Sequence, residues 1–342
     1  AGERAAFPDE LYAAAGAAVG DRGQVIGGAD LVVTVGRPED AALSAIPKRA
    51  ALLGLLAPLG DPAYVGKLAD AGISALSMDA IPRITRAQAM DALSSQSNIA
   101  GYKAVLLAAA ELPKFFPMLT TAAGTIRPAK VLILGAGVAG LQAIATARRL
   151  GAVVSAYDTR AVVKEQVQSL GASFLEFDLG GDAEGAGGYA KELTPEQIAK
   201  QRQFMVDHIG ASDVVITTAL VPGRPAPLLI TQEAVAAMAP GSVIVDLAAE
   251  AGGNCVVTQR DQTIVTGNGV HVIGKTNLAA TMPYHASQLY SRNVQALLDA
   301  LVKDGSLNLD PADEIARGTT IVRQGEIVHQ PTLDALGAGV AS

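Results

Sequence analysis

The chain has 342 residues, of which half are hydrophobic and only 17% are charged, and its formal net charge is −7. This length allows two domains, and the apolar composition is typical of an α/β protein whose sheets are covered on both faces. The acidic balance without a basic stripe argues against nucleic acid as a partner. The single cysteine, Cys255, excludes a disulfide framework and suits a reducing cytoplasm, where its expected role is packing.

The N-terminal region of the chain predicts an α/β layer of its own. Helical and strand-like patterns alternate there, and a long helix follows as a candidate connection to a second domain. Strands are expected over 29–35, 49–57 and 73–80, helices over 11–19, 39–46, 62–72 and 97–112, and a loop over 120–128. The opening residues lack the pattern of a signal peptide.

The rest of the chain continues with alternating strands and helices. Strands are expected at 173–177, 213–218, 242–247 and 270–274, and helices near 161–169, 231–238 and 283–303. The segment 179–192 is rich in glycine and charge and is expected to be a mobile loop, and the tail at 319–332 is expected to return as a hairpin to the first domain. We predict two Rossmann-like, doubly wound parallel-sheet domains joined by long helices, with a cleft between them: 1–94 with 286–342, and 95–285 as the NAD(H)-binding domain.

The strongest functional motif lies in residues 131–158, which predict a strand, a glycine turn, a helix and a second strand. Gly135, Gly137 and Gly140 have G-x-G-x-x-G spacing, which permits a tight turn, a close approach to a pyrophosphate and packing of helix on strand. Asp158 ends the second strand, where a carboxylate would bind the adenosine ribose. A structural turn in an α/β core is the alternative. Repulsion of about 1–4 kcal/mol between Asp158 and a 2′-phosphate favours NAD(H) over NADP(H), although Arg160 is a neighbouring cation.

A polar cluster precedes the long helix. Thr85 and Gln88 match a capping box, in which Thr85 would cap a helix and Gln88 would reach back to its backbone. Arg83, Asp91 and Ser94 accompany them, with Asp91 and Ser94 on roughly the same helical face as Gln88. From the residues alone, a solvated helix start and a functional patch both remain open.

Proton-transfer and metal-binding groups are scarce. The histidines, His208, His271, His285 and His329, all follow Asp158, and their spacing predicts no metal site. Asp246, after an expected strand, is a candidate acid for proton transfer, and a hydrogen-bonded carboxylate at a strand end is the simpler interpretation.

Several segments together carry a resemblance to a known family. They are RITRAQAMDALSSQSNIAGYKAV, VLILGAGVAGLQAIATARRLGAVVSAYDTRAVVKEQVQSLG, GGYAKE, TTALVPGRPAP and SVIVDLAAEAGGN. From about residue 8 onward, the chain resembles the NAD(H)-binding domain I of proton-translocating NAD(P) transhydrogenases, in the alanine dehydrogenase/transhydrogenase family. The motifs PRITRAQAMD and GGYAKE distinguish these proteins from alanine dehydrogenases, which are similar in fold.

The resemblance implies roles for individual residues. The polar cluster matches the loop around the nicotinamide ring and its ribose, with Gln88 also reaching toward the nucleotide on a partner domain, and Tyr189 matches the tyrosine of a mobile loop. The predicted catalytic residues are Gln88, Arg83, Asp91 and Ser94, and the predicted cofactor-binding residues are Gly135, Ala136, Gly137, Val138, Gly140, Asp158, Thr159, Arg160, Gly188, Tyr189, Thr218, Ala219 and Leu220.

The resemblance also implies a function. The chain would belong to an NAD(P)+ transhydrogenase (Re/Si-specific, proton-translocating), as a homodimer that is active only with its partners. NADH bound here would give hydride to NADP+ on the NADP(H)-binding domain of the β subunit, while membrane-spanning subunits translocate protons. The chain would then be cytoplasmic and peripheral to the inner (plasma) membrane. Because only a hydride moves between the two nicotinamides, no general acid or base is needed.

Two departures from the family pattern bear on the alternatives. Amino-acid-metabolising relatives carry a lysine and a histidine at places that fall on Gly36 and Ala57 here. Their absence disfavours an alanine-type or opine dehydrogenase, which remains an alternative, as does a non-enzymatic NAD(H) sensor. Family members also begin with a strand and a Lys-Glu-rich segment ahead of the position of Ala1, so one edge of the first domain is expected to be incomplete.

Overall fold

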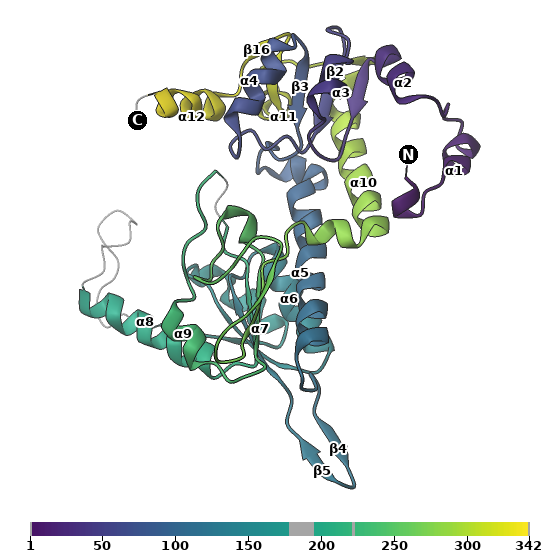
Figure 1. Cartoon of the computed structure of the whole chain (residues 1–342). Helices are drawn as coiled ribbons and strands as arrows, with labels where there is room; N and C mark the ends of the chain where they lie inside the picture. The colour runs from purple at the N-terminus through teal and green to yellow at the C-terminus, as the bar shows by residue number, and fades with distance from the viewer. Residues whose placement is uncertain (1, 178–194, 221–222, 341–342) are drawn as a thin grey trace. The chain divides into compact units, whose positions relative to one another are not determined.

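The structure, a computed structural model, describes residues 2–177, 195–220 and 223–340. The chain forms two compact units (Figure 1): unit 1 consists of Ala1–Gln96 and Ala280–Ser342, and unit 2 consists of Ser97–Ala279. Both units are built from helices around a sheet in which parallel pairing dominates. The predicted α/β class is confirmed.

The sheet of unit 1 has the strand order β1-β2-β3-β15-β16. Its strands are β1 (Leu31–Val33), β2 (Ala51–Gly54), β3 (Ser74–Ser77), β15 (Thr320–Arg323) and β16 (Glu326–Ile327). The first three are parallel, whereas β15 is antiparallel to β3 and forms a hairpin with β16. The prediction that the tail returns to the first domain as a hairpin is therefore confirmed.

Successive residues of β2 point to opposite faces of this sheet, and each face has its own core. Leu52 packs in one cluster with Val65 and Leu68 of α4, and Leu53 packs in another with Leu297 of α10. The helical elements of unit 1 are η1 (Glu3–Ala5), α1 (Asp9–Ala14), α2 (Arg22–Gly28), α3 (Asp40–Ser44), α4 (Pro62–Asp70), η2 (Thr85–Met90), α10 (Pro283–Leu301), α11 (Glu314–Thr319) and α12 (Gln330–Val340), with a small β13 (Val302–Lys303) and β14 (Ser306–Leu307) ribbon. Helix α1 ends at Ala14, so the helix predicted over 11–19 was too long.

The sheet of unit 2 has the order β11-β12-β10-β9-β6-β7-β8 and is parallel except for the edge strand β11. Its strands are β6 (Lys130–Leu134), β7 (Val153–Tyr157), β8 (Ser173–Phe174), β9 (Val214–Thr217), β10 (Val243–Asp246), β11 (Thr263–Val265) and β12 (His271–Ile273). Its helical elements are α5 (Ala92–Glu111), which begins in unit 1, α6 (Val138–Arg149), η3 (Ala161–Val163), α7 (Lys164–Ser169), α8 (Pro195–Gly210), α9 (Gln232–Ala237), η4 (Ala249–Ala251) and η5 (Leu278–Thr281).

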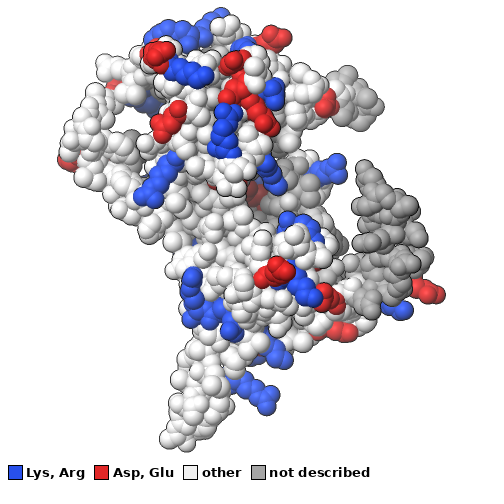
Figure 2. Space-filling model, turned by 180° about the vertical axis from the view of Figure 1, so that it is seen from behind, with Lys and Arg blue, Asp and Glu red and all other residues white. Residues whose placement is uncertain are grey.

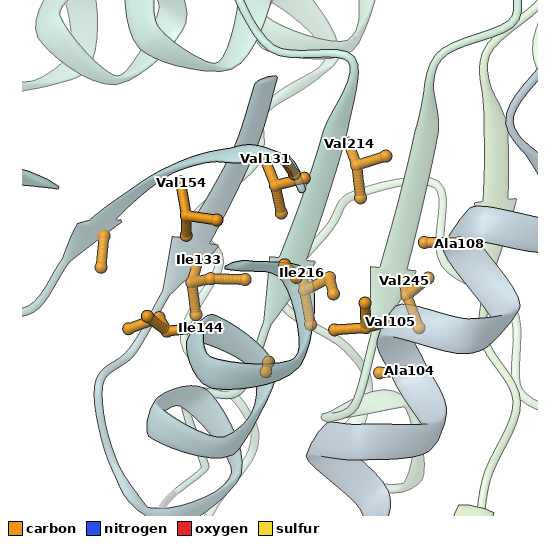
Figure 3. Close-up of a cluster of buried hydrophobic side chains, with 14 of the residues drawn as sticks. Ala104, Val105, Ala108, Val131, Ile133, Ile144, Val154, Val214, Ile216 and Val245 are labelled. Carbon is orange, nitrogen blue, oxygen red and sulfur yellow. The ribbon is translucent and has the colours of Figure 1, made fainter. Parts of the chain in front are cut away.

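Helices cover both faces of this sheet. Figure 3 shows one face, where Val131 and Ile133 of β6 pack with Val105 of α5 and Ile144 of α6. Leu132 points to the other face, where its cluster includes residues of α8 and α9. Helix α5 approaches α6 so closely that a Cβ atom on Gly101 would lie 2.1 Å from the carbonyl oxygen of Ala139.

The segment predicted as a loop over 120–128 contains a hairpin, which corrects that prediction. Strands β4 (Leu119–Thr121) and β5 (Gly124–Ile126) pair antiparallel and project from unit 2 (Figure 1). Met118 and Ile126 on this hairpin are exposed. Over the described ranges, no helix combines the length and the apolar character required to cross a membrane.

Candidate dinucleotide site

The glycine turn joins β6 to α6 at the carboxyl edge of the unit 2 sheet. Gly135 has φ +100°, and a Cβ atom there would lie 2.4 Å from Oγ1 of Thr218. A Cβ atom on Gly140 would lie 1.9 Å from the carbonyl oxygen of Gly135, so α6 packs directly on the turn. Gly137 differs, because its φ is −77° and no described atom lies within 4 Å of a Cβ there. Neither backbone conformation nor packing within the described chain requires glycine at position 137.

The first turn of α6 offers backbone donors. Gly137 is the N-cap residue, and no side chain of the described residues caps this helix end. The first N–H groups of a helix have no partner within the helix, and the aligned peptide dipoles make this end attractive to anions. A diphosphate would find donors here that a Cβ on Gly137 would obstruct.

Asp158 follows β7 and faces this turn. Its side chain is only 6% exposed, and one oxygen accepts a hydrogen bond of 2.7 Å from the N–H of Ala136. The Arg160 guanidinium forms a bidentate contact with the carboxylate, at 3.0 Å from Nε and 2.9 Å from Nη2. Burial alone would raise the pKa of Asp158, but the hydrogen bonds from Arg160 and Ala136 outweigh burial and hold that pKa below its usual value. The site therefore carries a negative charge at neutral pH.

The segment after β9 completes this edge. Oγ1 of Thr218 donates to the carbonyl oxygen of Gly135 over 3.0 Å, and the next residues are Ala219 and the exposed Leu220. Strand β6 lies between β7 and β9 in the sheet. The predicted cofactor residues Gly135, Ala136, Gly137, Val138, Gly140, Asp158, Thr159, Arg160, Thr218, Ala219 and Leu220 thus follow or flank three neighbouring strand ends of unit 2. Gly188, Tyr189 and the rest of 179–192 lie outside the described residues.

The predicted polar cluster belongs to unit 1, and its capping was predicted incorrectly. The helix η2 begins at Thr85 itself, its N-cap is Ile84, and it has no side-chain cap, so the Thr85–Gln88 capping box does not form. Asp91 instead precedes α5 and accepts hydrogen bonds from the N–H of Ser94 at 2.9 Å and from its Oγ at 2.6 Å.

The other two members of that cluster face solvent. Arg83 and Gln88 are exposed, and within the described residues neither side chain makes a hydrogen bond or ion pair. Their exposure leaves both side chains available to a ligand or partner.

Asp246, the candidate acid, is fully buried. Its oxygens accept hydrogen bonds from the backbone of Ala248, Asn254 and Cys255 and from the hydroxyls of Thr217 and Thr258. A carboxylate with these donors is a structural centre that cannot exchange protons with a ligand. Among the described residues, no group of three or more acidic, histidine or cysteine side chains could hold a metal ion.

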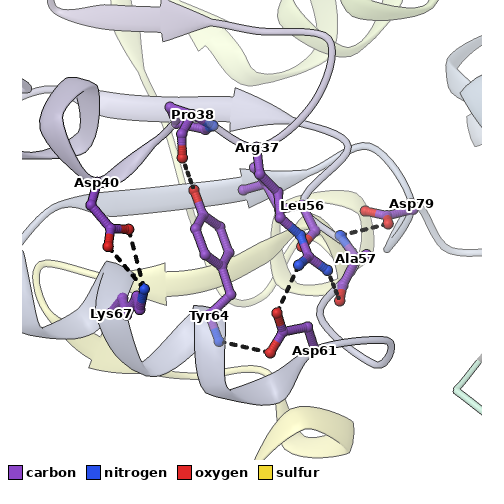
Figure 4. Close-up of polar contacts among 9 residues, drawn as sticks. All are labelled: Arg37, Pro38, Asp40, Leu56, Ala57, Asp61, Tyr64, Lys67 and Asp79. Atoms are coloured by element: carbon purple, nitrogen blue, oxygen red, sulfur yellow. Dashed lines mark hydrogen bonds and ion pairs between the residues drawn. The ribbon is translucent and has the colours of Figure 1, made fainter.

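The carboxyl edge of the unit 1 sheet carries a different network (Figure 4). Ala57 has φ +49°, and its N–H donates to Asp79 over 2.7 Å. Arg37 lies across the same edge, where Nε donates to the carbonyl oxygen of Leu56 over 2.9 Å and Nη1 contacts Asp61 at 2.8 Å. The cation at this edge is therefore bound to the protein itself.

The sheets and the glycine turn define the class of the protein: an α/β protein of two units, one of which has a nucleotide-binding fold. Family models described as alanine dehydrogenase/PNT, N-terminal domain and alanine dehydrogenase/PNT, C-terminal domain match residues 1–100 and 104–330. The chain belongs to the alanine dehydrogenase/PNT family.

Curated relatives are similar over nearly the whole chain. NAD(P) transhydrogenase subunit alpha of Haemophilus influenzae is 47% identical over 95% of this chain and 64% of its own length. The corresponding protein of Cereibacter sphaeroides is 46% identical over 100% of this chain and 66% of its own length, so the chain spans less than two thirds of these two relatives. In Rhodospirillum rubrum, the first of the proteins that make up NAD(P) transhydrogenase subunit alpha is 47% identical over 99% of this chain and 90% of its own length.

Solved structures agree with this family. A transhydrogenase from Sinorhizobium meliloti has a TM-score of 0.82 and 41% identity, over 95% of this chain and 86% of that one. An L-alanine dehydrogenase has a TM-score of 0.79 over 98% of this chain and 88% of that one, but at 23% identity it shows only the shared fold. The resemblance inferred from the sequence motifs is confirmed.

Proposed function

We propose that this chain is the NAD(H)-binding component of a Re/Si-specific, proton-translocating NAD(P)+ transhydrogenase. The observation that carries the NAD(H) site is Gly137, a glycine that packing and backbone conformation leave unexplained, at the uncapped start of α6 beside a charged Asp158. The names of the relatives support the transhydrogenase assignment. The bound nicotinamide would supply the hydride, and NADP(H) would be held by the partner domain of the β subunit.

The residues of unit 2 would bind and orient the dinucleotide. The N–H groups at the start of α6 would hold the pyrophosphate, and Asp158 would accept hydrogen bonds from the adenosine ribose. The fork of Arg160 now covers that carboxylate, so a ribose hydroxyl would have to displace one of its hydrogen bonds. Because the 2′-phosphate of NADP(H) would lie beside the anionic Asp158, the site favours NAD(H).

The roles of Arg83, Gln88, Asp91 and Ser94 toward the nicotinamide rest on the family resemblance. Since the capping box does not form, helix capping no longer explains Gln88. We expect Gln88→Asn to leave the melting temperature and NADH affinity unchanged and to slow single-turnover hydride transfer at least about tenfold, because a small misplacement of reacting groups costs rate. An unchanged rate would remove Gln88 from the transfer step.

The chain would act as a homodimer, and the β4–β5 hairpin is the surface that we propose for self-association. It projects from unit 2 with Met118 and Ile126 exposed at 65% and 45%, and Figure 2 draws it almost entirely without charged residues. An exposed apolar ribbon of this kind favours burial against a partner. Met118→Glu combined with Ile126→Glu should yield monomers in sedimentation experiments, and an unchanged mass would place the interface elsewhere.

The decisive experiment mixes the chain with an NADP(H)-binding partner domain, NADH and an oxidised NADP analogue. Hydride transfer that requires both proteins supports the proposal, and NADH binding without transfer would favour an NAD(H) sensor. The same preparation, given pyruvate, ammonia and NADH, tests an alanine-type dehydrogenase. We expect no turnover, because the carboxyl edge of unit 1 has Ala57 and a self-bound Arg37 in place of a free lysine and histidine. The membrane location would come only through the membrane-spanning partner subunits.

A further inference from the structure

The segment after β9 is held by one buried amide, Asn254. Its side chain donates from Nδ2 to the carbonyl oxygens of Ala219 at 2.9 Å and Pro227 at 2.8 Å, and its Oδ1 accepts from the N–H of Ala219 at 3.2 Å. Asn254 is 0% exposed. The amide thus binds both backbone groups of Ala219, so a shift of Asn254 would shift this residue with it.

Asn254 is in turn fixed by the buried carboxylate of Asp246. The N–H of Asn254 donates to Asp246 over 2.7 Å, and the Asp246 carboxylate also binds Thr217 at the end of β9 over 2.9 Å. The glycine before Asn254 has φ +88°, and a Cβ there would lie 2.7 Å from the Asp246 oxygen. Asp246 therefore couples the end of β9 to the turn that carries Asn254.

This network ends at the glycine turn. Ala219 follows Thr218, whose hydroxyl donates to the carbonyl oxygen of Gly135. The sheet order places β9 on one side of β6 and β7, with Asp158 at its end, on the other. A dinucleotide that lies across the strand ends with its adenosine ribose at Asp158 must extend its other half toward the β9 side.

We propose that Asn254, held by Asp246, is a positioning residue for the nicotinamide half of the dinucleotide. It holds the backbone of Thr218–Leu220 against the glycine turn, at the distance that this half requires. The inference rests on the proposed NAD(H) site and adds to it a residue that touches no ligand. It predicts an effect on NADH that is absent for a ligand made of the adenosine half alone.

The test compares NADH with ADP on the full chain, by fluorescence titration and competition well below the melting temperature. In Asn254→Ser, which keeps the backbone bond to Asp246, we expect NADH to bind at least about tenfold more weakly and ADP to bind within about twofold of the wild type. Thr217→Val, a milder change that removes one donor to Asp246, should show the same preference with a smaller loss.

Asn268→Ser is the matched control. Asn268 also binds backbone carbonyls through Nδ2, those of Val235 at 3.0 Å and Met238 at 3.2 Å, near the end of α9. This variant should lower the melting temperature and leave both affinities unchanged. Asp158→Ala should weaken both ligands, because Asp158 serves the adenosine half.

The outcomes separate the inference from the proposed function. Equal weakening of NADH and ADP in Asn254→Ser, or NADH affinity within about twofold of the wild type, would overturn the positioning role while leaving the NAD(H) site intact. A wild-type chain that does not bind NADH would overturn both.

Discussion

The carboxyl edges of the two sheets differ in where their polar groups point. In unit 2, the edge consists of a glycine turn and an uncapped helix start, whose donors have no partners within the helix. In unit 1, Arg37, Asp79 and Asp61 bind the strand-end backbone and one another, which satisfies the edge internally. The same parallel architecture thus provides a ligand site in one unit and a closed network in the other, and the difference lies in a few side chains.

The largest expected effect comes from disturbing the support of the glycine turn. In Gly101→Ala, the new methyl group would lie 2.1 Å from the carbonyl oxygen of Ala139, so α5 and α6 must move apart. We expect a loss of about 3 kcal/mol in the free energy of unfolding, as for overpacked cores. Denaturant titration measures it. Gly66→Ala, in α4 with no atom within 4 Å, is the control and should stabilise by about 0.5–1 kcal/mol.

Gly137→Ala tests the open side of unit 2. The backbone accepts alanine at φ −77° and the methyl group meets no described atom, so the melting temperature should not fall. NADH affinity should fall at least about tenfold, near 1.4 kcal/mol, because the methyl group would stand where the pyrophosphate approaches. Gly36→Ala, at the edge of unit 1, should change neither quantity. Full NADH affinity in Gly137→Ala would count against the phosphate turn.

Asp158→Asn tests the charge of the site. Because the folded pKa of Asp158 lies below its ordinary value of 3.8, the carboxylate stabilises the folded state above that pH, and this contribution disappears as the pH falls through the folded pKa. The stability difference between wild type and variant should therefore be constant near neutral pH and shrink in acid. NADH binding at neutral pH should weaken by about 1–3 kcal/mol. A pH-independent stability difference would contradict the assignment.

Arg37→Ala gives the smallest effect and completes the comparison. It removes hydrogen bonds to Leu56 and Ala57 and a partly exposed ion pair with Asp61, so unfolding should become easier by about 1 kcal/mol. NADH affinity should stay unchanged, because the network of unit 1 satisfies only itself. Arg37→Lys, which keeps the charge but loses the planar fork, should recover some of the stability. A change in NADH affinity would show that the two edges are coupled.

Local patterns predicted the features of this molecule that local physics decides. The apolar segment at Val131 bounded by Gly135 gave β6, and Asp158 follows β7 as expected, because burial selects apolar strands and the turn selects glycine. The capping box failed because a Thr-x-x-Gln pattern does not reveal where a helix starts, and Asp91 holds the capping position instead.

Other features have no local signal. The β4–β5 strands are exposed, so no alternation of buried residues marks them. The role of Asn254 depends on contacts with Ala219, far away in the sequence, and only the folded chain shows them.

The position of β15 in the unit 1 sheet has a consequence for the order of assembly during synthesis. Strand β3 ends at Ser77, but its neighbour β15 begins only at Thr320. At about 5–20 residues per second, the ribosome needs roughly 10–50 s to make the chain between them. During this interval all of unit 2 is translated, while β3 has an unpaired edge that could pair with other chains. The nucleotide-binding unit is thus the insert that can fold first, and its host unit is completed last.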